Sequence, residues 1–462
     1  MAKPNPAAAE PLPVYQSAEK IYPREISGRY ATFSRWSTII LLGLFYAVPW
    51  LQYEGRQAFL FDLPARKFYL LGLTLWPQDF PFLAMLLIIA AITLFFFTAL
   101  LGRVWCGFAC PQTVWTEAFI WMEQWTEGTR SQRMKLDRAP MSWNKFRRKF
   151  AKQFLWITFS LWTGYTFVGY FTPIREFGVE LLSFQVGGWA LFWTLFYGFA
   201  TYGNAGYMRE QVCKYMCPYA RFQSAMFDKD TLVISYDQSR GDPRGSRKRD
   251  SDYKAKGLGD CIDCTLCVQV CPTGIDIRDG LQYECIACGA CVDACNSIMD
   301  KMSYPRGLVR YTTEHAVSGT ETRIIRPRVI VYATLLTVLV GGLATAMLTR
   351  TPVILDVIRD RNALYRELPS DLIENTYTIK IINQSNEPRE FVLTAEGLDG
   401  LVLDGVPDLI AVGGGEVKSL PIRARVPRNE VRGSQEITFT ATPDDNAEHR
   451  RAAESRFVGP IS

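Results

Sequence analysis

Eight cysteines in the middle of the chain form two quartets with the same internal spacing. The first runs Cys-x2-Cys-x2-Cys-x3-Cys-Pro, and the second repeats this pattern without the final proline. Three closely spaced thiolates can each take one corner of an iron–sulfur cubane, while the fourth reaches the neighbouring cluster. The spacing therefore predicts two [4Fe–4S] clusters that relay single electrons, with these ligand sets: Cys261, Cys264, Cys267 and Cys295; Cys285, Cys288, Cys291 and Cys271.

Two other uses of these cysteines fit the pattern less well. A disulfide framework is disfavoured in a reducing cytoplasm. Zinc sites usually show paired cysteines, or cysteine with histidine, rather than triplets with a remote fourth ligand. Asn296 stands where the first quartet has Pro272. Because that proline shapes the turn after the ligand and binds no metal, we expect the change to have a small effect.

A second set of cysteines repeats the motif Cys-x3-Cys-Pro, once after each of two apolar segments. Cysteines four apart share one helical face, and a proline after the second marks a helix start or break. Free cysteines are often plain core residues, but duplication at equivalent positions favours function. Soft thiolates suit Cu(I), and a cysteine pair can also cycle between dithiol and disulfide. The members are Cys106, Cys110, Cys213 and Cys217.

These motifs need a membrane scaffold, and the sequence contains five uncharged apolar runs of a length that crosses a bilayer. The first 35 residues are polar, which predicts an uncleaved anchor rather than a signal peptide. We therefore expect a five-helix transmembrane bundle. The runs are Trp36–Tyr53, Phe80–Gly102, Gln153–Ile174, a stretch inside Leu181–Met208, and Val329–Thr349.

Charge sets the expected orientation, because Lys and Arg resist translocation. Residues 102–153 hold 10 Lys and Arg against 4 Asp and Glu, whereas residues 350–462 hold 14 against 18. This predicts a membrane protein with its N-terminus and all cysteines on the cytoplasmic side and its C-terminal part on the outer side. The expected divisions are a cytoplasmic segment 1–35, four helices with both Cys-x3-Cys-Pro motifs in 36–228, a cytoplasmic two-cluster ferredoxin-like domain in 229–327, a fifth helix in 328–349, and an outer domain in 350–462.

Several function classes lack the residues they need. The two histidines, His315 and His449, lie outside the expected spans, so a membrane haem with paired histidine ligands is excluded. No Gly-rich dinucleotide loop follows a strand. The basic segment 237–259 is expected to be a solvated linker near anionic lipid. No folded reading module accompanies it, so we expect no nucleic-acid partner.

After the fifth run the hydrophobic pattern changes to short alternating stretches separated by Asn, Pro and Gly. Tyr377, Ile379 and Ile381 alternate with polar residues, and so do Ile437 and Phe439. Similar pairs and runs occur at Phe391 and Leu393 and from Leu420 to Val426. Period-two runs of this kind predict a small β-sandwich. The region has no cysteine, so its core must stabilise it without a disulfide.

The whole layout resembles the cytochrome c oxidase accessory proteins of the CcoG/FixG/RdxA family. The resemblance rests on both cysteine sets and on the segment DVIRDRNALYR at 356–366, and it extends over a C-terminal immunoglobulin-like domain. It implies a role in assembling a cbb3-type oxidase in the inner membrane of a Gram-negative bacterium, so that residues 350–462 would be periplasmic. It also implies that Cu(II) is reduced to Cu(I) for the oxidase copper centre. The implied partners are assembly factors and copper chaperones or transporters; the electron donor is not identified. In this interpretation Cys106, Cys110, Cys213 and Cys217, which follow the second and fourth apolar runs, bind or reduce copper.

Two alternatives come from different classes of protein. Quinol-dehydrogenase membrane subunits of the NapH type share both cysteine motifs, and there the boundary region would take electrons from quinol. A non-enzymatic assembly scaffold would use its clusters only to stabilise the fold. Residues 350–462 favour the oxidase-assembly interpretation, because the sandwich is extra to a minimal quinol module.

Overall fold

The chain forms two compact units in the computed structural model, which describes residues 20–249, 251–361, 363–385, 387–444 and 450–460. The first unit comprises the described residues up to Phe61 together with Leu86–Val338. The second comprises Asp62–Met85 and the described residues from Leu339 onward. His449 and Asn362 lie outside the described residues.

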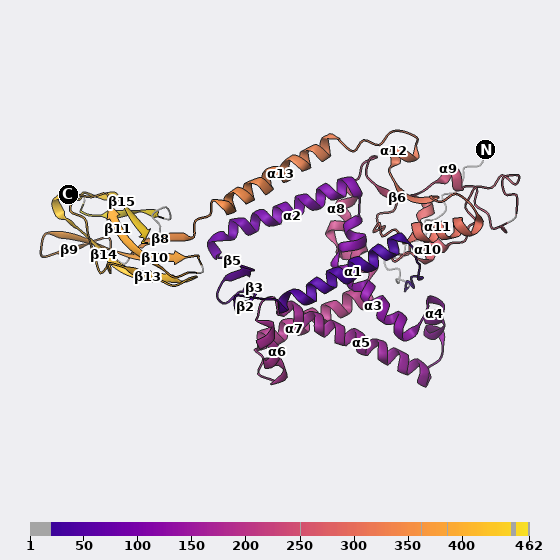
Figure 1. The fold of residues 1–462 in the computed structure, drawn as a ribbon, viewed down its shortest axis with the longest axis horizontal. Helices are drawn as coiled ribbons and strands as arrows, with labels where there is room; N and C mark the ends of the chain where they lie inside the picture. The colour runs from indigo at the N-terminus through magenta and orange to yellow at the C-terminus, as the bar shows by residue number, and fades with distance from the viewer. Residues whose placement is uncertain (1–19, 250, 362, 386, 445–449, 461–462) are drawn as a thin grey trace, which may run out of the picture. The chain divides into compact units, whose positions relative to one another are not determined.

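Helices dominate the first unit (Figure 1). They pack through small and aromatic residues: Leu42 of the first helix contacts Val114 and Ala118, and Trp156 packs on Phe119. A Cβ on Gly164 would lie 2.1 Å from the carbonyl oxygen of Thr194, so glycine is what lets two helices cross closely there. The helices of this unit include α1 (Arg29–Ala47), α3 (Pro111–Glu127), α4 (Arg130–Arg138), α5 (Trp143–Val168), α6 (Ile174–Leu182), α7 (Gly188–Thr201) and α8 (Pro218–Met226). Two more helices, α2 (Phe80–Leu101) and α13 (Pro327–Leu348), belong to the first unit only from Leu86 and up to Val338.

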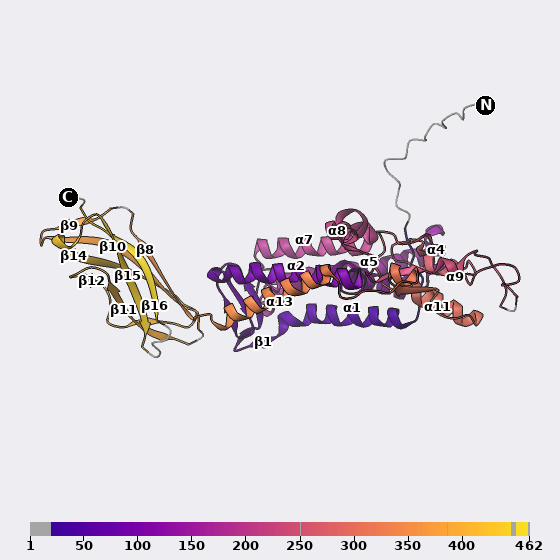
Figure 2. The ribbon, with the colours of Figure 1, turned by 90° about the horizontal axis from the view of Figure 1, so that it is seen from above.

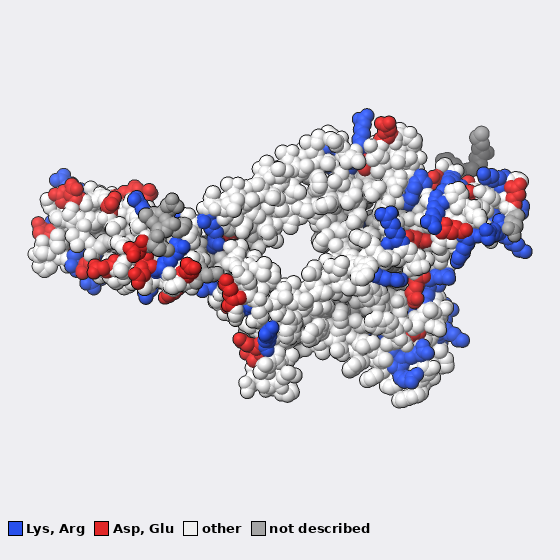
Figure 3. Space-filling view, in the orientation of Figure 1, with Lys and Arg blue, Asp and Glu red and all other residues white. Residues whose placement is uncertain are grey.

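Three helical stretches of the described residues are long and apolar enough to cross a membrane. They are Arg29–Trp50, Pro77–Leu101 and Pro327–Leu348. Their surfaces are almost free of charge, whereas Lys and Arg gather over the ferredoxin-like region and the α4–α5 connection (Figure 3). These three stretches match the first, second and fifth predicted runs.

The third and fourth predicted runs correspond to elements of a different kind. The third lies in α5, which ends at Val168 rather than Ile174 and whose first turns carry Lys145, Arg147 and Arg148. The fourth lies in α7, whose 14 residues extend only about 21 Å at 1.5 Å per residue. A π-helix, η4 (Tyr202–Met208), continues it. The count of five spans therefore stays a prediction.

A small α/β region between α8 and α13 carries both cysteine quartets. Strands β6 (Val233–Tyr236) and β7 (Val309–Thr312) pair antiparallel. One strand precedes the two cysteine quartets of this region in the sequence and the other follows them. Ile234, Met299 and Leu308 lie at the centre of its core. Its other elements are α9 (Gln238–Gly241), α10 (Leu266–Gln269), η6 (Ile277–Asp279), α11 (Ala290–Met302) and α12 (Glu314–Val317).

Two arginines of the basic segment 237–259, which is predicted to be a solvated linker, have partners within the structure. Arg240 pairs with Asp260 at 2.5 Å. The Arg247 guanidinium lies 4.4 Å from the ring centre of Tyr253 and 5.3 Å from that of Tyr304. These arginines therefore stabilise the ferredoxin-like region, because each meets a partner within that region.

The second unit is the predicted β-sandwich, with its strands in orange and yellow in Figures 1 and 2. One sheet has the order β12-β14-β10-β8, with β9 paired to β10, and the other has the order β13-β11-β15-β16. All pairs are antiparallel. The strands are β8 (Val353–Arg359), β9 (Arg366–Leu368), β10 (Leu372–Asn383), β11 (Arg389–Glu396), β12 (Val402–Asp404), β13 (Ile410–Val412), β14 (Val417–Pro427), β15 (Ser434–Pro443) and β16 (Arg451–Val458).

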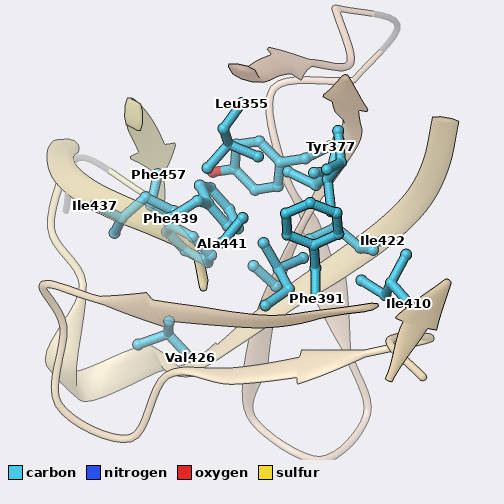
Figure 4. Close-up of a cluster of buried hydrophobic side chains, with 14 of the residues drawn as sticks. Leu355, Tyr377, Phe391, Ile410, Ile422, Val426, Ile437, Phe439, Ala441 and Phe457 are labelled. Carbon is cyan, nitrogen blue, oxygen red and sulfur yellow. The ribbon is translucent and has the colours of Figure 1, made fainter. Parts of the chain in front are cut away.

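The alternating residues form the sandwich core, as predicted from their spacing. Tyr377, Phe391 and Phe439 are fully buried, and their rings meet between the sheets (Figure 4). A short hairpin, β4 (Lys67–Leu70) and β5 (Leu73–Leu75), also belongs to this unit, and Lys67 Nζ donates to the Gly415 carbonyl at 2.7 Å. The remaining short strands are β1 (Gln52–Tyr53), β2 (Arg56–Gln57) and β3 (Phe59–Asp62).

Candidate iron–sulfur and thiol sites

The two cysteine triplets fold into loops of the same shape. Asp263 and Thr265 adopt φ of 54° and 56°, and the corresponding Ala287 and Gly289 adopt 54° and 76°. Each left-handed residue directly precedes or follows the middle cysteine of its triplet. Left-handed backbone costs free energy for residues other than glycine, so its repetition marks a required conformation. It curls each Cys-x2-Cys-x2-Cys segment around a centre.

Each predicted ligand set lines one small cavity. Cys261, Cys264, Cys267 and Cys295 line the first, together with apolar residues such as Leu266 and Met299. The four members of the other predicted set, Cys271, Cys285, Cys288 and Cys291, line the second. The structure thus brings the fourth cysteine of each motif to the opposite triplet, as expected from the spacing.

The donor chemistry of both cavities fits an iron–sulfur cluster. The four cysteines of the predicted set and mostly apolar residues line each one, and Cys267 of the first set also borders the second cavity. Burial raises the pKa of Cys267 and Cys285 to about 11 each, because a lone thiolate is poorly solvated there. Among the described residues, no three Cys, His, Asp or Glu side chains converge on a point that could hold a single ion. A cubane instead takes one ligand at each of four separate corners.

Both Cys-x3-Cys-Pro motifs fold alike and differ from the regular helical turn predicted for them. Trp105–Ala109 and Val212–Met216 are π-helices, η3 and η5. The amide of Cys110 donates to the Trp105 carbonyl at 2.8 Å, and that of Cys217 donates to the Val212 carbonyl at 2.8 Å. The second cysteine of each pair is extended, because the following proline disfavours helical backbone before it. The two cysteines of a pair therefore do not share one α-helical face.

The four thiols of these motifs lie within electrostatic reach of one another. Burial raises the pKa of Cys106 to about 12, and charge on Cys110, Cys213 or Cys217 would raise it further. Burial likewise raises the pKa of Cys213 to about 11, with Cys110 and Cys217 adding to the shift. At neutral pH Cys106 and Cys213 are therefore thiols rather than thiolates. The fold thus gathers two pairs that are about 100 residues apart in the sequence into one cluster, which we call the thiol quartet.

Polar side chains from α2 and α8 surround Cys106. Its Sγ donates to Oε1 of Gln223 at 3.2 Å. Gln223 in turn donates to the Tyr219 hydroxyl at 2.7 Å, which lies 2.8 Å from the hydroxyl of Thr98. Gln223 is fully buried. This chain of hydrogen bonds fixes the Cys106 thiol against the end of α2.

A buried ion-pair network, which the sequence analysis missed, holds the second thiol segment in place. Glu123 of α3 accepts from Arg133 at 3.1 Å and from Arg209 at 2.9 Å. Arg209 precedes η5 and has a φ of 42°. Burial alone would raise the pKa of Glu123, but Arg209, Lys20 and Arg133 outweigh it and hold that pKa at about 2. Isolated charges in a sequence do not reveal such pairing; the available sign was three glutamates, Glu117, Glu123 and Glu127, in a helix with no other charged residue.

A cavity of about 430 Å³ lies between the two cysteine systems in the first unit. Cys213 of the thiol quartet and Cys288 of the second cluster cavity both line it. Its wall includes Glu117 of α3, whose carboxylate accepts from Trp121 Nε1 at 3.0 Å. Burial raises the pKa of Glu117, and the indole hydrogen bond and Arg35 oppose the shift only in part.

Three ranges of the chain match models of known protein families. Residues 208–314 match a family described as a 4Fe–4S dicluster domain, and residues 343–460 match the IG-like fold at the C-terminal of FixG. Residues 83–128 match a 4Fe–4S binding domain, although this range contains only Cys106 and Cys110. The chain therefore carries two-cluster iron–sulfur and immunoglobulin-like domains.

Relatives extend the match over most of the chain. The "Nitrogen fixation protein FixG" of Rhizobium meliloti is 34% identical over 95% of this chain and 92% of its own. "Protein RdxB" of Cereibacter sphaeroides is 40% identical over 85% of this chain and 86% of its own. The crystal structure of a FixG-related protein from Vibrio parahaemolyticus shares 32% identity over 24% of this chain and 98% of its own, with a TM-score of 0.22. The chain belongs to the FixG/RdxA family.

Proposed function

We propose that this protein is a membrane-bound iron–sulfur oxidoreductase that reduces Cu(II) to Cu(I) at the thiol quartet. The observation that carries the proposal is the gathering of Cys106, Cys110, Cys213 and Cys217 next to a two-cluster iron–sulfur domain. Soft thiolates prefer Cu(I) over Cu(II), so binding there favours reduction. Family membership supports the further proposal that the Cu(I) serves assembly of a cbb3-type oxidase together with assembly factors and copper carriers.

The residues of the thiol quartet would hold copper and release protons. Because burial keeps Cys106 and Cys213 protonated, each thiol that binds copper must lose its proton. Two clusters held by the cysteine sets at 261–295 would supply single electrons to this site. Each Cu(II) takes up one electron, so a donor that releases two electrons reduces two copper ions. The proposed orientation has the clusters and thiols in the cytoplasm and the β-sandwich in the periplasm.

The test measures Cu(I) formed by purified, cluster-loaded protein that has been reduced and then freed of reductant. A Cu(I)-specific chelator reports the product. Cys106→Ser, Cys110→Ser, Cys213→Ser and Cys217→Ser should each lose most of the Cu(I) yield while retaining cluster absorbance. Tyr215→Ala is the matched control, because Tyr215 is 68% exposed and lies in the same π-helix as Cys213. Full activity in all four serine variants would contradict the proposal.

A second candidate function is quinol oxidation, which the 430 Å³ cavity favours. Its volume suits a small-molecule ring, and its wall combines apolar residues with the buried Glu117. A carboxyl with a raised pKa is suited to accept a proton near neutral pH. A hydroquinone bound there would release two electrons and two protons, and Cys288 lies at the wall on the cluster side.

The two candidates are separated with decylubiquinol as the donor. Quinol oxidation that continues without copper and is lost in Glu117→Gln would identify the quinol dehydrogenase. Glu314→Gln is the control, because the Glu314 side chain is 66% exposed. Neither activity, with both clusters intact, would leave the assembly scaffold as the function.

A further inference from the structure

The π-helix η3 of the first thiol pair packs directly on the loop that carries Cys285 and Cys288. A Cβ added to Gly107 would lie 2.8 Å from the carbonyl oxygens of both Ile286 and Ala287. Real Cβ atoms almost never come so close to another backbone. Gly107 is buried, and it stands between Cys106 and Phe108 in η3. The absence of a side chain at this position is therefore what allows the two backbones to touch.

Arg103, two residues after the end of α2, also stabilises the contact between η3 and the Cys285 loop by hydrogen bonds. Its guanidinium is buried, with 4% of the residue exposed. It donates to the carbonyls of Tyr283, Cys285 and Ala220, the second of these at 3.3 Å. Ala220 lies in α8, which begins at Pro218 directly after Cys217. One cation thus joins the first thiol segment, the loop of one cysteine quartet and the helix after the second thiol pair.

The charge of Arg103 also reaches thiols on both sides of the contact. Its guanidinium donates to the Cys285 carbonyl at 3.3 Å, and Arg103 stands three residues before Cys106 in the sequence. The interior screens the field of a buried cation weakly, so this charge stabilises negative charge gained at either site. The thiol quartet and the Cys285 loop therefore share one electrostatic environment.

The other cysteine quartet has a similar arginine with different surroundings. Arg247 Nη1 donates to the Cys261 carbonyl at 3.3 Å, and Nη2 donates to that of Gly259 at 2.7 Å. Its guanidinium stacks near Tyr253 and Tyr304 of the ferredoxin-like region. The cavity of this quartet is lined only by residues 236–309, and Cys264 is exposed to solvent.

We propose that Cys271, Cys285, Cys288 and Cys291 form the cluster site that is coupled to the thiol quartet, with Arg103 and Gly107 as its positioning residues. The site around Cys261, Cys264, Cys267 and Cys295 is then the remote one. This assignment rests on the proposed electron transfer to the thiols. It gives that transfer an order, in which the single electron that converts Cu(II) to Cu(I) arrives from the Cys285 side.

The first test compares Arg103→Gln with Arg247→Gln, which each remove one guanidinium that donates to a ligand-loop carbonyl at 3.3 Å. Loss of the Arg103 hydrogen bonds should raise amide hydrogen exchange in residues 283–288 about tenfold, as expected for a buried charge-assisted bond. Arg247→Gln should raise exchange around residues 259–261 instead. Equal protection of 283–288 in the wild type and Arg103→Gln would overturn the positioning role.

The second test measures coupling by potentiometric titration of the clusters with EPR detection. The cluster signals are first assigned with Cys288→Ser and Cys264→Ser. Cu(I) bound at the thiol quartet should shift the midpoint potential of the Cys285-side cluster and leave the other unchanged, and Arg103→Gln should reduce the shift. A shift confined to the Cys261-side cluster, or equal shifts in both, would overturn the assignment.

A glycine pair keeps the test independent of the arginine and of copper chemistry. Gly107→Ala should raise exchange in 283–288 and slow electron arrival at the thiols, whereas Gly203→Ala should not. Gly203 also lies in a π-helix, but no atom lies within 4 Å of a Cβ placed there. If the wild type failed to reduce Cu(II), the proposed function would fail, while the exchange data would still decide whether Arg103 and Gly107 hold the loop.

Discussion

Replacing Glu123 by glutamine should destabilise the helical unit by about 3 kcal/mol at neutral pH. The Glu123 side chain is fully buried between Arg133 and Arg209. Its pKa is about 2 against an ordinary value of 4.5, and each unit of difference corresponds to about 1.4 kcal/mol. The same order follows from leaving two buried cations without their partner, which costs about 3–5 kcal/mol.

The sign of the pH dependence follows from the direction of the shift. Because folding lowers the pKa of Glu123, its contribution is fully present above about pH 4.5 and is lost as the pH falls toward 2. The stability difference between the wild type and Glu123→Gln should therefore shrink over that interval. Protonated glutamate and glutamine carry the same charge, so the two proteins converge in acid.

Unfolding of the detergent-solubilised protein by denaturant, followed by tryptophan fluorescence, measures this difference. Every tryptophan except Trp76 lies in the first unit, and Trp156 lies 5.6 Å from the Arg209 guanidinium. Glu314→Gln is the control, because its exposed pair with Lys229 at 3.6 Å should contribute less than about 1 kcal/mol. A Glu123→Gln protein within about 0.5 kcal/mol of the wild type at pH 7 would refute the reasoning.

Three further predictions concern the sandwich, the thiols and the clusters. Phe439→Ala should destabilise the β-sandwich by about 3–5 kcal/mol, because the ring is fully buried, whereas Val392→Ala, at a 38% exposed position, should have a small effect in the same thermal scan. Alkylation of Cys106 in protein free of added metal, followed by peptide mass spectrometry, should quicken about tenfold per pH unit from 7 to 10; a plateau below pH 10 would show that its pKa is not near 12. Removing iron with a chelator should raise hydrogen exchange in α11 far more than in β10, because only α11 carries cluster cysteines.

The cysteine spacing alone predicted how the ligand sets cross between motifs. Cys-x2-Cys-x2-Cys is short enough to curl around one centre, and the structure places Cys271 and Cys295 at the opposite triplets. The β-sandwich could also be predicted from the sequence, because a period of two residues determines which side chains of a strand face inward. Tyr377, Ile379 and Ile381 are all fully buried. In both cases the structure follows from a local pattern of residues close together in the sequence.

The predicted membrane spans agree with the structure where a single helix contains the whole apolar run. Phe80–Leu101 and Pro327–Leu348 matched their runs closely. The third and fourth runs lie in α5, which begins in charged residues, and in α7, which continues into a π-helix, so these two spans stay predictions. Hydropathy averages residues along the chain and does not register a change of helix type.

The thiol quartet depended on contacts between distant segments. No spacing in the sequence joins Cys106 to Cys213, and a regular helical turn was the wrong local structure for both pairs. Tertiary structure alone showed Arg103 and Gly107 against the Cys285 loop and Glu123 beside Arg209. Ligand spacing within a loop is a local property of the chain, whereas the burial and pairing of single charges exist only once remote helices have packed.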